Sequence, residues 1–234
     1  MAVFLIGTVM TFRKPIWGIY LYIFSFYFSP HRTWWADLVP DLRYLQIAAI
    51  ATLISAFLHG SFNAQRTAWL DATYKLFAVF VAFIWITSFW EQTGDWQILG
   101  RELFAKHLVI TTLMIVLITN FEEVKRVILA NIIGGLWLGW QAYGKQGPRL
   151  EGLAGALADA NTLGMHMACV ALLAGLMLLS GRGYYRWISF ASLPLILNTV
   201  VLTGSRGAFV GLVAGGIASA FLIPKKLRAA FIAA

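Results

Sequence analysis

A series of long apolar runs, each bounded by charge, Pro or Gly, constrains the fold of this chain more than any other feature. Hydrophobic residues make up 60% of the 234 residues and charged residues 12%, against roughly 45–50% and about 25% in soluble domains. Only helices and closed barrels satisfy backbone hydrogen bonds in lipid, and continuous apolar runs without strict alternation favour helices. We therefore predict an all-α protein, a polytopic transmembrane helix bundle of about eight spans. The predicted spans are Pro15–Ser29, Arg43–His59, Asp71–Trp90, Leu103–Thr119, Arg126–Tyr143, Asn161–Ser180, Trp187–Thr203 and Ala208–Ile223.

No repeat, linker or low-complexity tract divides the chain, so we predict one membrane-embedded domain over residues 1–234. The apolar run Ala2–Met10 is too short to span alone, because a span needs roughly 17–25 residues. Its charges follow it, at Arg13 and Lys14, whereas those of a signal peptide come first. The apolar residues Ala229–Ala234 follow a basic cluster and look like the start of another span. We therefore expect the chain to be the N-terminal part of a longer protein.

The distribution of cations predicts an orientation. If the end with Arg13 and Lys14 is cytoplasmic and the spans alternate, eleven of the 18 Lys and Arg residues lie on the cytoplasmic side. The positive-inside rule favours this orientation, which puts Arg206 and the loop Gly144–Ala160 on the outer face. The cations lie in short loops and form no basic patch with exposed aromatics, so we expect no nucleic-acid partner.

Arg206 and its neighbour Ser205 lie in a short polar break, Leu202–Phe209, between two apolar runs. A permanent cation near membrane depth costs a few kcal/mol unless an anionic or polar group receives it. A planar guanidinium beside Gly and Ser backbone amides suits a phosphate or a carboxylate. The alternative is that Arg206 marks a loop between two spans and reaches the lipid headgroups.

A second group of polar residues opens the sixth span. If a helix begins near Asp159, four polar residues fall on one of its faces and could line a substrate groove: Asp159, Thr162, His166 and Cys169. The alternative is that Asp159 or Asn161 caps the helix and that His166 is a hydrogen-bonded core residue. One His, one Cys and one Asp lack the spacing of a metal site, so we expect no metal.

Small residues recur every four positions on two of the spans and predict close helix packing. One stripe is Asn131, Gly135 and Gly139, and the other is Gly207, Gly211, Gly215 and Ser219. The sequence holds no nucleotide-binding glycine loop, metalloprotease helix or nucleophile elbow. If the protein is an enzyme, we therefore expect it to use a membrane-embedded donor and no ATP or NAD.

The stretch Leu202–Ala208 resembles the Ser-Arg-Gly signature of the O-antigen ligase and Wzy-type polymerase superfamily. Four further stretches lie in order before it. Together they are most similar to the N-terminal portion of the exosortase-associated O-glycosylation ligases, and the resemblance covers most of the chain. The four stretches are Pro15–Gly18, Ser29–Arg32, Arg149–Gly152 and Asp159–Asn161.

The resemblance implies a multi-pass glycosyltransferase of the bacterial inner membrane that needs no cofactor. Such an enzyme takes a glycan from an undecaprenyl-pyrophosphate carrier at the periplasmic face and transfers it to a glycan, lipid or protein acceptor. Arg206 would bind the pyrophosphate and stabilise the charge of the leaving group. The other substrate-binding residues that we predict are Ser205, Arg149, Asp159 and Asn161.

The chain departs from the family in two respects. The usual Asp-Pro-Asn is Asp159-Ala160-Asn161 here. The family's large periplasmic loop, with its important histidine, lies beyond the matched region, so the catalytic residues stay unknown. Three other functions stay open: a Wzy-type polysaccharide polymerase, a transporter or flippase that binds an anionic lipid or solute at Arg206, and a non-catalytic membrane scaffold.

Overall fold

The computed structural model describes residues 2–28, 40, 42–64, 72–88, 90, 95–145, 149–150, 153, 157 and 159–222. Every regular element within these ranges is a helix, which confirms the all-α prediction. Three stretches that the sequence singles out lie outside the described residues: Ser29–Arg32, Glu151–Gly152 and the apolar end Ala229–Ala234.

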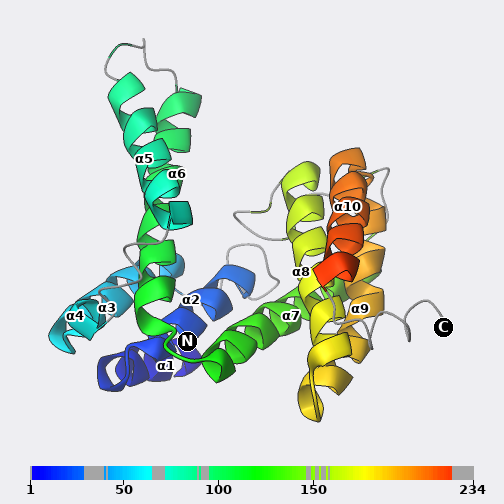
Figure 1. The fold of residues 1–234 in the computed structure, drawn as a ribbon, viewed down its shortest axis with the longest axis horizontal. Helices are drawn as coiled ribbons and strands as arrows, with labels where there is room; N and C mark the ends of the chain where they lie inside the picture. The colour runs from blue at the N-terminus through cyan, green and yellow to red at the C-terminus, as the bar shows by residue number, and fades with distance from the viewer. Residues whose placement is uncertain are drawn as a thin grey trace. The chain divides into compact units, whose positions relative to one another are not determined.

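Each predicted apolar run is helical over most of its length (Figure 1), and the helix over the run Leu103–Thr119 begins earlier, at Asp95. The helices are α1 (Ala2–Arg13), α2 (Ile16–Tyr27), α3 (Tyr44–Leu58), α4 (Ser61–Ala64), α5 (Ala72–Thr87), α6 (Asp95–Leu117), α7 (Phe121–Tyr143), α8 (Ala160–Ser180), α9 (Tyr184–Thr203) and α10 (Arg206–Leu222). Helix α7 begins earlier than its apolar run because polar side chains cap it. The Glu123 amide donates to Asn120 Oδ1 at 2.9 Å, and the Glu123 carboxylate accepts from the Thr119 amide at 2.8 Å, in the manner of a capping box.

Two of the described helices are long and apolar enough to cross a membrane, by length and composition: α8, with 21 residues, and α9, with 20. Five others are apolar but shorter, namely α1, α2, α3, α5 and α10. Helices α6 and α7 have 23 residues each but include several charged side chains. The eight-span arrangement therefore stays a prediction.

The chain forms two compact units, and the prediction of a single domain stays a prediction. Unit 1 comprises residues 1–22 and 45–123, and unit 2 comprises residues 23–44 and 124–234. Unit 1 contains α1, most of α2, and α3 to α6, whereas unit 2 contains the end of α2, most of α7, and α8 to α10.

Within unit 1, a proline determines how α1 meets its neighbours. Pro15 has no N–H, so the carbonyl of Thr11 lacks its partner four residues on. The Ser55 hydroxyl of α3 donates to that carbonyl at 2.6 Å. Helix α3 also approaches α2 closely, because a Cβ on Gly18 would overlap the Thr52 side chain. A hydrogen bond therefore joins α1 to α3, and a close glycine contact joins α2 to α3.

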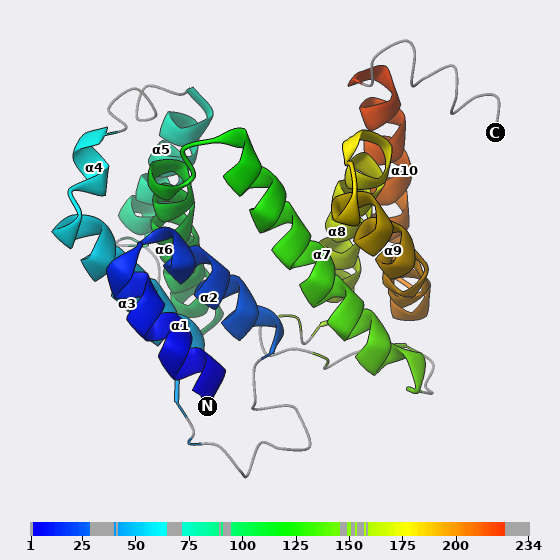
Figure 2. The same ribbon diagram turned by 90° about the horizontal axis from the view of Figure 1, so that it is seen from below.

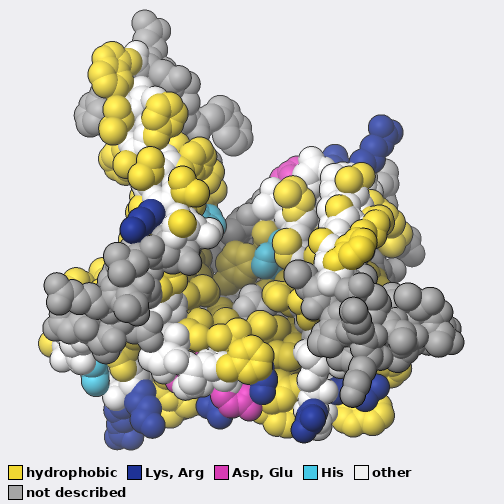
Figure 3. Space-filling view, in the orientation of Figure 1, with side chains coloured by type: hydrophobic (Ala, Val, Ile, Leu, Met, Phe, Trp, Pro, Cys, Tyr) yellow, Lys and Arg dark blue, Asp and Glu magenta, His cyan; other side chains and the backbone are white. Residues whose placement is uncertain are grey.

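Helices α5 and α6 form a pair within the same unit. The Tyr74 and Thr112 hydroxyls lie 2.8 Å apart between them, and the Arg101 guanidinium lies 4.8 Å from the centre of the Trp85 ring. Figure 3 shows hydrophobic side chains exposed over α5. Leu76, Val79 and Phe83 are among the exposed residues of this helix. This exposed apolar surface agrees with a lipid environment.

Unit 2 is built on the antiparallel pair α8 and α9, with α10 beside α8. Helix α7 runs beside this pair (Figure 2), and its glycines let it approach closely. A Cβ on Gly135 would lie 2.8 Å from Val170 of α8, and one on Gly139 would lie 2.9 Å from the Leu195 carbonyl oxygen of α9. The packing predicted for the glycine stripe on α7 is therefore present.

Candidate functional site

The polar break between the last two apolar runs is a tight turn from α9 into α10. Gly204 ends α9 in the left-handed conformation, with φ 60° and ψ 17°, and its amide donates to the Val201 carbonyl. A residue with a side chain would be strained there. Ser205 follows, only 2% exposed, and its Oγ accepts from the Ala208 amide at 3.3 Å. Ser205 is thus the N-cap of α10, and Arg206 is the first residue of the helix.

The first turn of α8 packs directly on this turn. A Cβ on Gly164 would lie 2.7 Å from Thr203 Oγ1 and 3.0 Å from both Ser205 Cβ and Ala208 Cβ. Further along, Gly215 of α10 meets the Leu172 side chain of α8. Helices α8 and α10 are therefore parallel, and both begin at the same end of unit 2. Their N-terminal amides, and the positive ends of their helix dipoles, lie close together.

Arg149 ties the preceding loop to the same end. Its Nε donates to the Thr203 carbonyl at 3.0 Å, and its Nη2 donates to Asn161 Oδ1 at 2.6 Å. The next amide, of Leu150, donates to the Leu202 carbonyl at 3.0 Å. These are two of the carbonyls that a helix leaves unpaired at its C-terminus. Arg149 therefore caps α9 and connects it to the start of α8.

Asp159 is the N-cap of α8, in agreement with one of the two interpretations of the sequence. Its Oδ2 accepts from the Thr162 amide at 2.9 Å and from the Thr162 hydroxyl at 3.2 Å. The hydrogen bond from the Thr162 amide, with a smaller contribution from the Arg149 charge, holds the pKa of Asp159 below its ordinary value. At neutral pH the exposed carboxyl group is therefore ionised and places one negative charge near Arg149.

The Arg206 guanidinium remains available. Its side chain is exposed, and among the described residues no hydrogen bond or ion pair holds it. An arginine at the N-terminus of a helix is disfavoured by the helix dipole. Two helix N-termini, an arginine fixed by the fold and an arginine with no partner among the described residues form a surface suited to an anionic oxygen-rich group.

All five predicted substrate-binding residues lie at this end of unit 2: Arg149, Asp159, Asn161, Ser205 and Arg206. Four of them make structural hydrogen bonds, and Arg206 is the one that the described residues leave open. Sequence reasoning missed Gly164 and Thr203, which hold the turn and Arg149 in place. A glycine one turn inside a capped helix could have indicated the close contact, whereas no signal marks the Thr203 carbonyl.

The four polar residues predicted to share one face of α8 have different surroundings. Cys169 is exposed, and His166 faces a separate cluster in unit 2. There, His166 Nε2 lies 2.8 Å from the Tyr27 hydroxyl, which lies 3.3 Å from Asn131 Oδ1. Asn131 also donates to the Val127 carbonyl at 2.9 Å. These contacts favour the interpretation of His166 as a hydrogen-bonded core histidine.

Within the described part of the chain, no three His, Cys, Asp or Glu side chains lie where they could hold a metal ion. No family model, curated protein or solved structure matches the chain. Its function is therefore inferred from its own residues and their contacts.

Proposed function

We propose that the chain is part of a membrane glycosyltransferase similar to the O-antigen ligases. In this proposal it lies in the bacterial inner membrane with about eight spans. It binds an undecaprenyl-pyrophosphate-linked glycan at the periplasmic face, and the glycan passes to a glycan, lipid or protein acceptor. The two membrane-length helices α8 and α9 support the membrane environment, and the order of the sequence motifs supports the family.

The single observation that carries the proposal is the open Arg206 guanidinium at the shared end of α8 and α10. A pyrophosphate carries closely spaced anionic oxygens, and a guanidinium can bind two of them at once. Arg206 binds these oxygens, and the backbone amides of the two helix N-termini add to the positive potential. As the bond from the sugar to the pyrophosphate breaks, the same groups stabilise the charge that develops on the leaving group.

Arg149 acts as a positioning residue in this proposal. Because it joins the Thr203 carbonyl to Asn161, it fixes the turn that presents Arg206. Asp159 ends α8 in a defined position and balances part of the positive charge. Neither residue has to touch the reacting atoms.

The test is glycan transfer by the full-length protein in membranes, measured with Arg206→Ala, Arg206→Lys and a control, Arg182→Ala. Arg182 is also an exposed arginine, on the turn between α8 and α9 at the opposite end of the pair. We expect a loss of roughly 100-fold or more for Arg206→Ala, because an electrostatic stabiliser of the transition state is removed. Arg206→Lys restores the charge but not the two-pronged contact, so its activity should lie in between.

Membrane insertion of each variant, measured by flotation with membranes, should be unchanged. Normal transfer by Arg206→Ala would exclude Arg206 from the mechanism. Transport of an anionic lipid or solute that depends on Arg206, with no glycan transfer by the wild type, would instead support the transporter alternative.

A further inference from the structure

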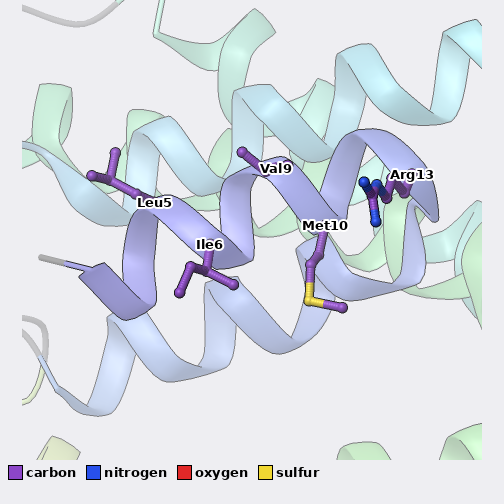
Figure 4. A pocket seen from close by; sticks show the side chains of 5 residues that line it. All are labelled: Leu5, Ile6, Val9, Met10 and Arg13. Carbon is purple, nitrogen blue, oxygen red and sulfur yellow. The ribbon is translucent and has the colours of Figure 1, made fainter.

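An open groove runs along one side of α1 in unit 1. Its lining residues are Leu5, Ile6, Val9, Met10 and Arg13, and its volume is about 450 Å³. Figure 4 shows the four apolar side chains along the helix and Arg13 at its C-terminal end. The volume falls within the range of about 300–1,000 Å³ that is typical of small-molecule sites. The α1 groove thus offers a ligand an apolar wall that ends in a cation.

This groove lies on the side of α1 that its neighbours leave free. Phe4 and Thr11 are buried on the opposite side, where a Cβ on Gly7 would lie 2.7 Å from Leu21 of α2. In the groove, by contrast, Ile6 and Val9 are each 60% exposed. No described element covers them, so the groove is accessible to a ligand in the surrounding solvent or bilayer.

The charged end of the groove is suited to an anion. Arg13 and the adjacent Lys14 are both exposed, and α1 contains no acidic residue. Trp17, 40% exposed, follows in the first turn of α2, with its ring edge-on to Tyr20. Trp beside Lys and Arg is typical of the level of the lipid headgroups. The apolar part of the groove would then point from the headgroups toward the middle of the bilayer.

The length of the groove matches one leaflet. Leu5 and Arg13 are eight positions apart, which is about 12 Å along a helix at about 1.5 Å per residue. One leaflet contributes about half of a hydrocarbon core of roughly 30 Å. An acyl chain whose headgroup lies at Arg13 would therefore follow the apolar wall without leaving its own leaflet.

We propose that the α1 groove binds one anionic phospholipid from the leaflet on the Arg13 side. Its phosphate contacts Arg13 and Lys14, and one acyl chain lies against Leu5, Ile6 and Val9. This site rests on the membrane environment of the proposed function, but not on glycan transfer, and it belongs to a different unit from Arg206.

The charge can be tested by native mass spectrometry of the full chain in detergent, titrated with phosphatidylglycerol or with phosphatidylcholine of the same acyl chains. We expect the wild type to bind phosphatidylglycerol roughly tenfold or more tightly than phosphatidylcholine, since each cation near a headgroup favours an anionic lipid. The double variant Arg13→Gln/Lys14→Gln should lose this preference. The matched control Arg182→Gln/Arg186→Gln, which removes one exposed cation from the turn between α8 and α9 and one from the first turn of α9, should keep it.

The apolar wall is tested separately with Val9→Trp, which fills the groove and leaves the charge unchanged. We expect weaker binding of both lipids, whereas Val3→Trp, at an exposed position of α1 outside the groove, should behave like the wild type. Thermal unfolding of each variant checks that α1 still packs.

Three results would overturn the site. Equal loss in both double variants would mean that any surface cation attracts the lipid, and equal behaviour of the two Trp variants would mean that no acyl chain lies in the groove. Disulfide cross-linking of two copies through Val9→Cys, in a Cys169→Ala background, would assign this face to a second copy. Arg206→Ala can abolish transfer while lipid binding is unchanged, or leave transfer unchanged while lipid binding is lost. Either result decides the two proposals separately.

Discussion

The two glycine stripes of unit 2 have the same spacing but different surroundings. On α7, Gly135 and Gly139 touch α8 and α9 so closely that a methyl group would meet them at 2.8–2.9 Å. On α10, a methyl group on Gly207 or Gly211 would have no described atom within 4 Å, whereas one on Gly215 would meet Leu172. Spacing of small residues therefore permits close packing but does not show whether a partner helix uses it.

The largest change in stability should come from Gly139→Ala, in the glycine stripe of α7 that packs against α8 and α9. Its new methyl group would meet the backbone of α9 at Leu195, which cannot move aside as a side-chain tip can. Overpacking of this kind costs about 1–3 kcal/mol. Thermal unfolding of the purified protein in detergent measures it. If this variant is as stable as the wild type, α7 and α9 are further apart than the contact at Leu195 requires, and the contrast between the stripes disappears.

A substitution in the glycine stripe of α10 should change the stability in the opposite direction. Gly211→Ala adds a methyl group where no described atom lies within 4 Å, and alanine favours a helix over glycine by about 1 kcal/mol. We expect a modest rise in the unfolding temperature under the same conditions. A clear destabilisation would mean that another helix, from this or another chain, packs against that face of α10 and closes the second stripe as well.

Gly215→Ala lies between these cases and should change stability least of the three. The methyl group would meet Leu172 Cδ1, the end of a side chain that can rotate, so the cost of moving it offsets the gain in helix propensity. An unfolding temperature close to that of the wild type is expected. A loss as large as that of Gly139→Ala would show that contact with a side chain and contact with a backbone are equally rigid here.

The N-terminus of α8 differs from the two glycine stripes, because a titratable cap, Asp159, stabilises it in addition to packing. The pKa of Asp159 is lowered from its ordinary value of 3.8, first by the bond from the Thr162 amide. The ionised cap therefore stabilises the fold above about pH 4, and this contribution is lost as the pH falls through the lowered value. Asp159→Asn keeps a capping side chain without the titration.

We expect the difference in unfolding temperature between the wild type and Asp159→Asn to be constant above about pH 4 and to change as the pH falls below that value, through the lowered pKa of Asp159. Parallel profiles over the whole range would mean that Asp159 has the same pKa in the folded and unfolded chains. Gly164→Ala, which alters the packing at the same end, should give no such pH dependence.

The sequence predicts the helices better than it predicts their contacts. Long apolar runs mark all the principal helices, and Asp159 is recognisable as a cap because it directly precedes a long apolar run. The start of α7 could not be predicted in the same way, because its cap, Asn120, lies before a charged first turn. A boundary placed at the first charge is wrong there, since acidic residues favour the start of a helix.

The contacts at the candidate site are harder to predict because they join distant parts of the chain. Arg149 and the Thr203 carbonyl are 54 residues apart, and a backbone carbonyl has no signature in the sequence. The motif around Arg206 could be found, since glycine, serine and arginine interrupt an apolar run. Ser205 is buried as a helix cap, whereas Arg206 is exposed. This difference depends on how α8 packs against the turn.

The corner between α1 and α2 has a consequence for biosynthesis. The Thr11 carbonyl, which Pro15 leaves without a partner in its own helix, accepts a hydrogen bond from Ser55, and Ser55 leaves the ribosome more than forty residues later. Because chains are folded from the N-terminus as they are made, the first two helices enter their surroundings with this bond unmade. The third helix completes it on arrival, so the beginning of the protein reaches its final form only after a later segment has been inserted.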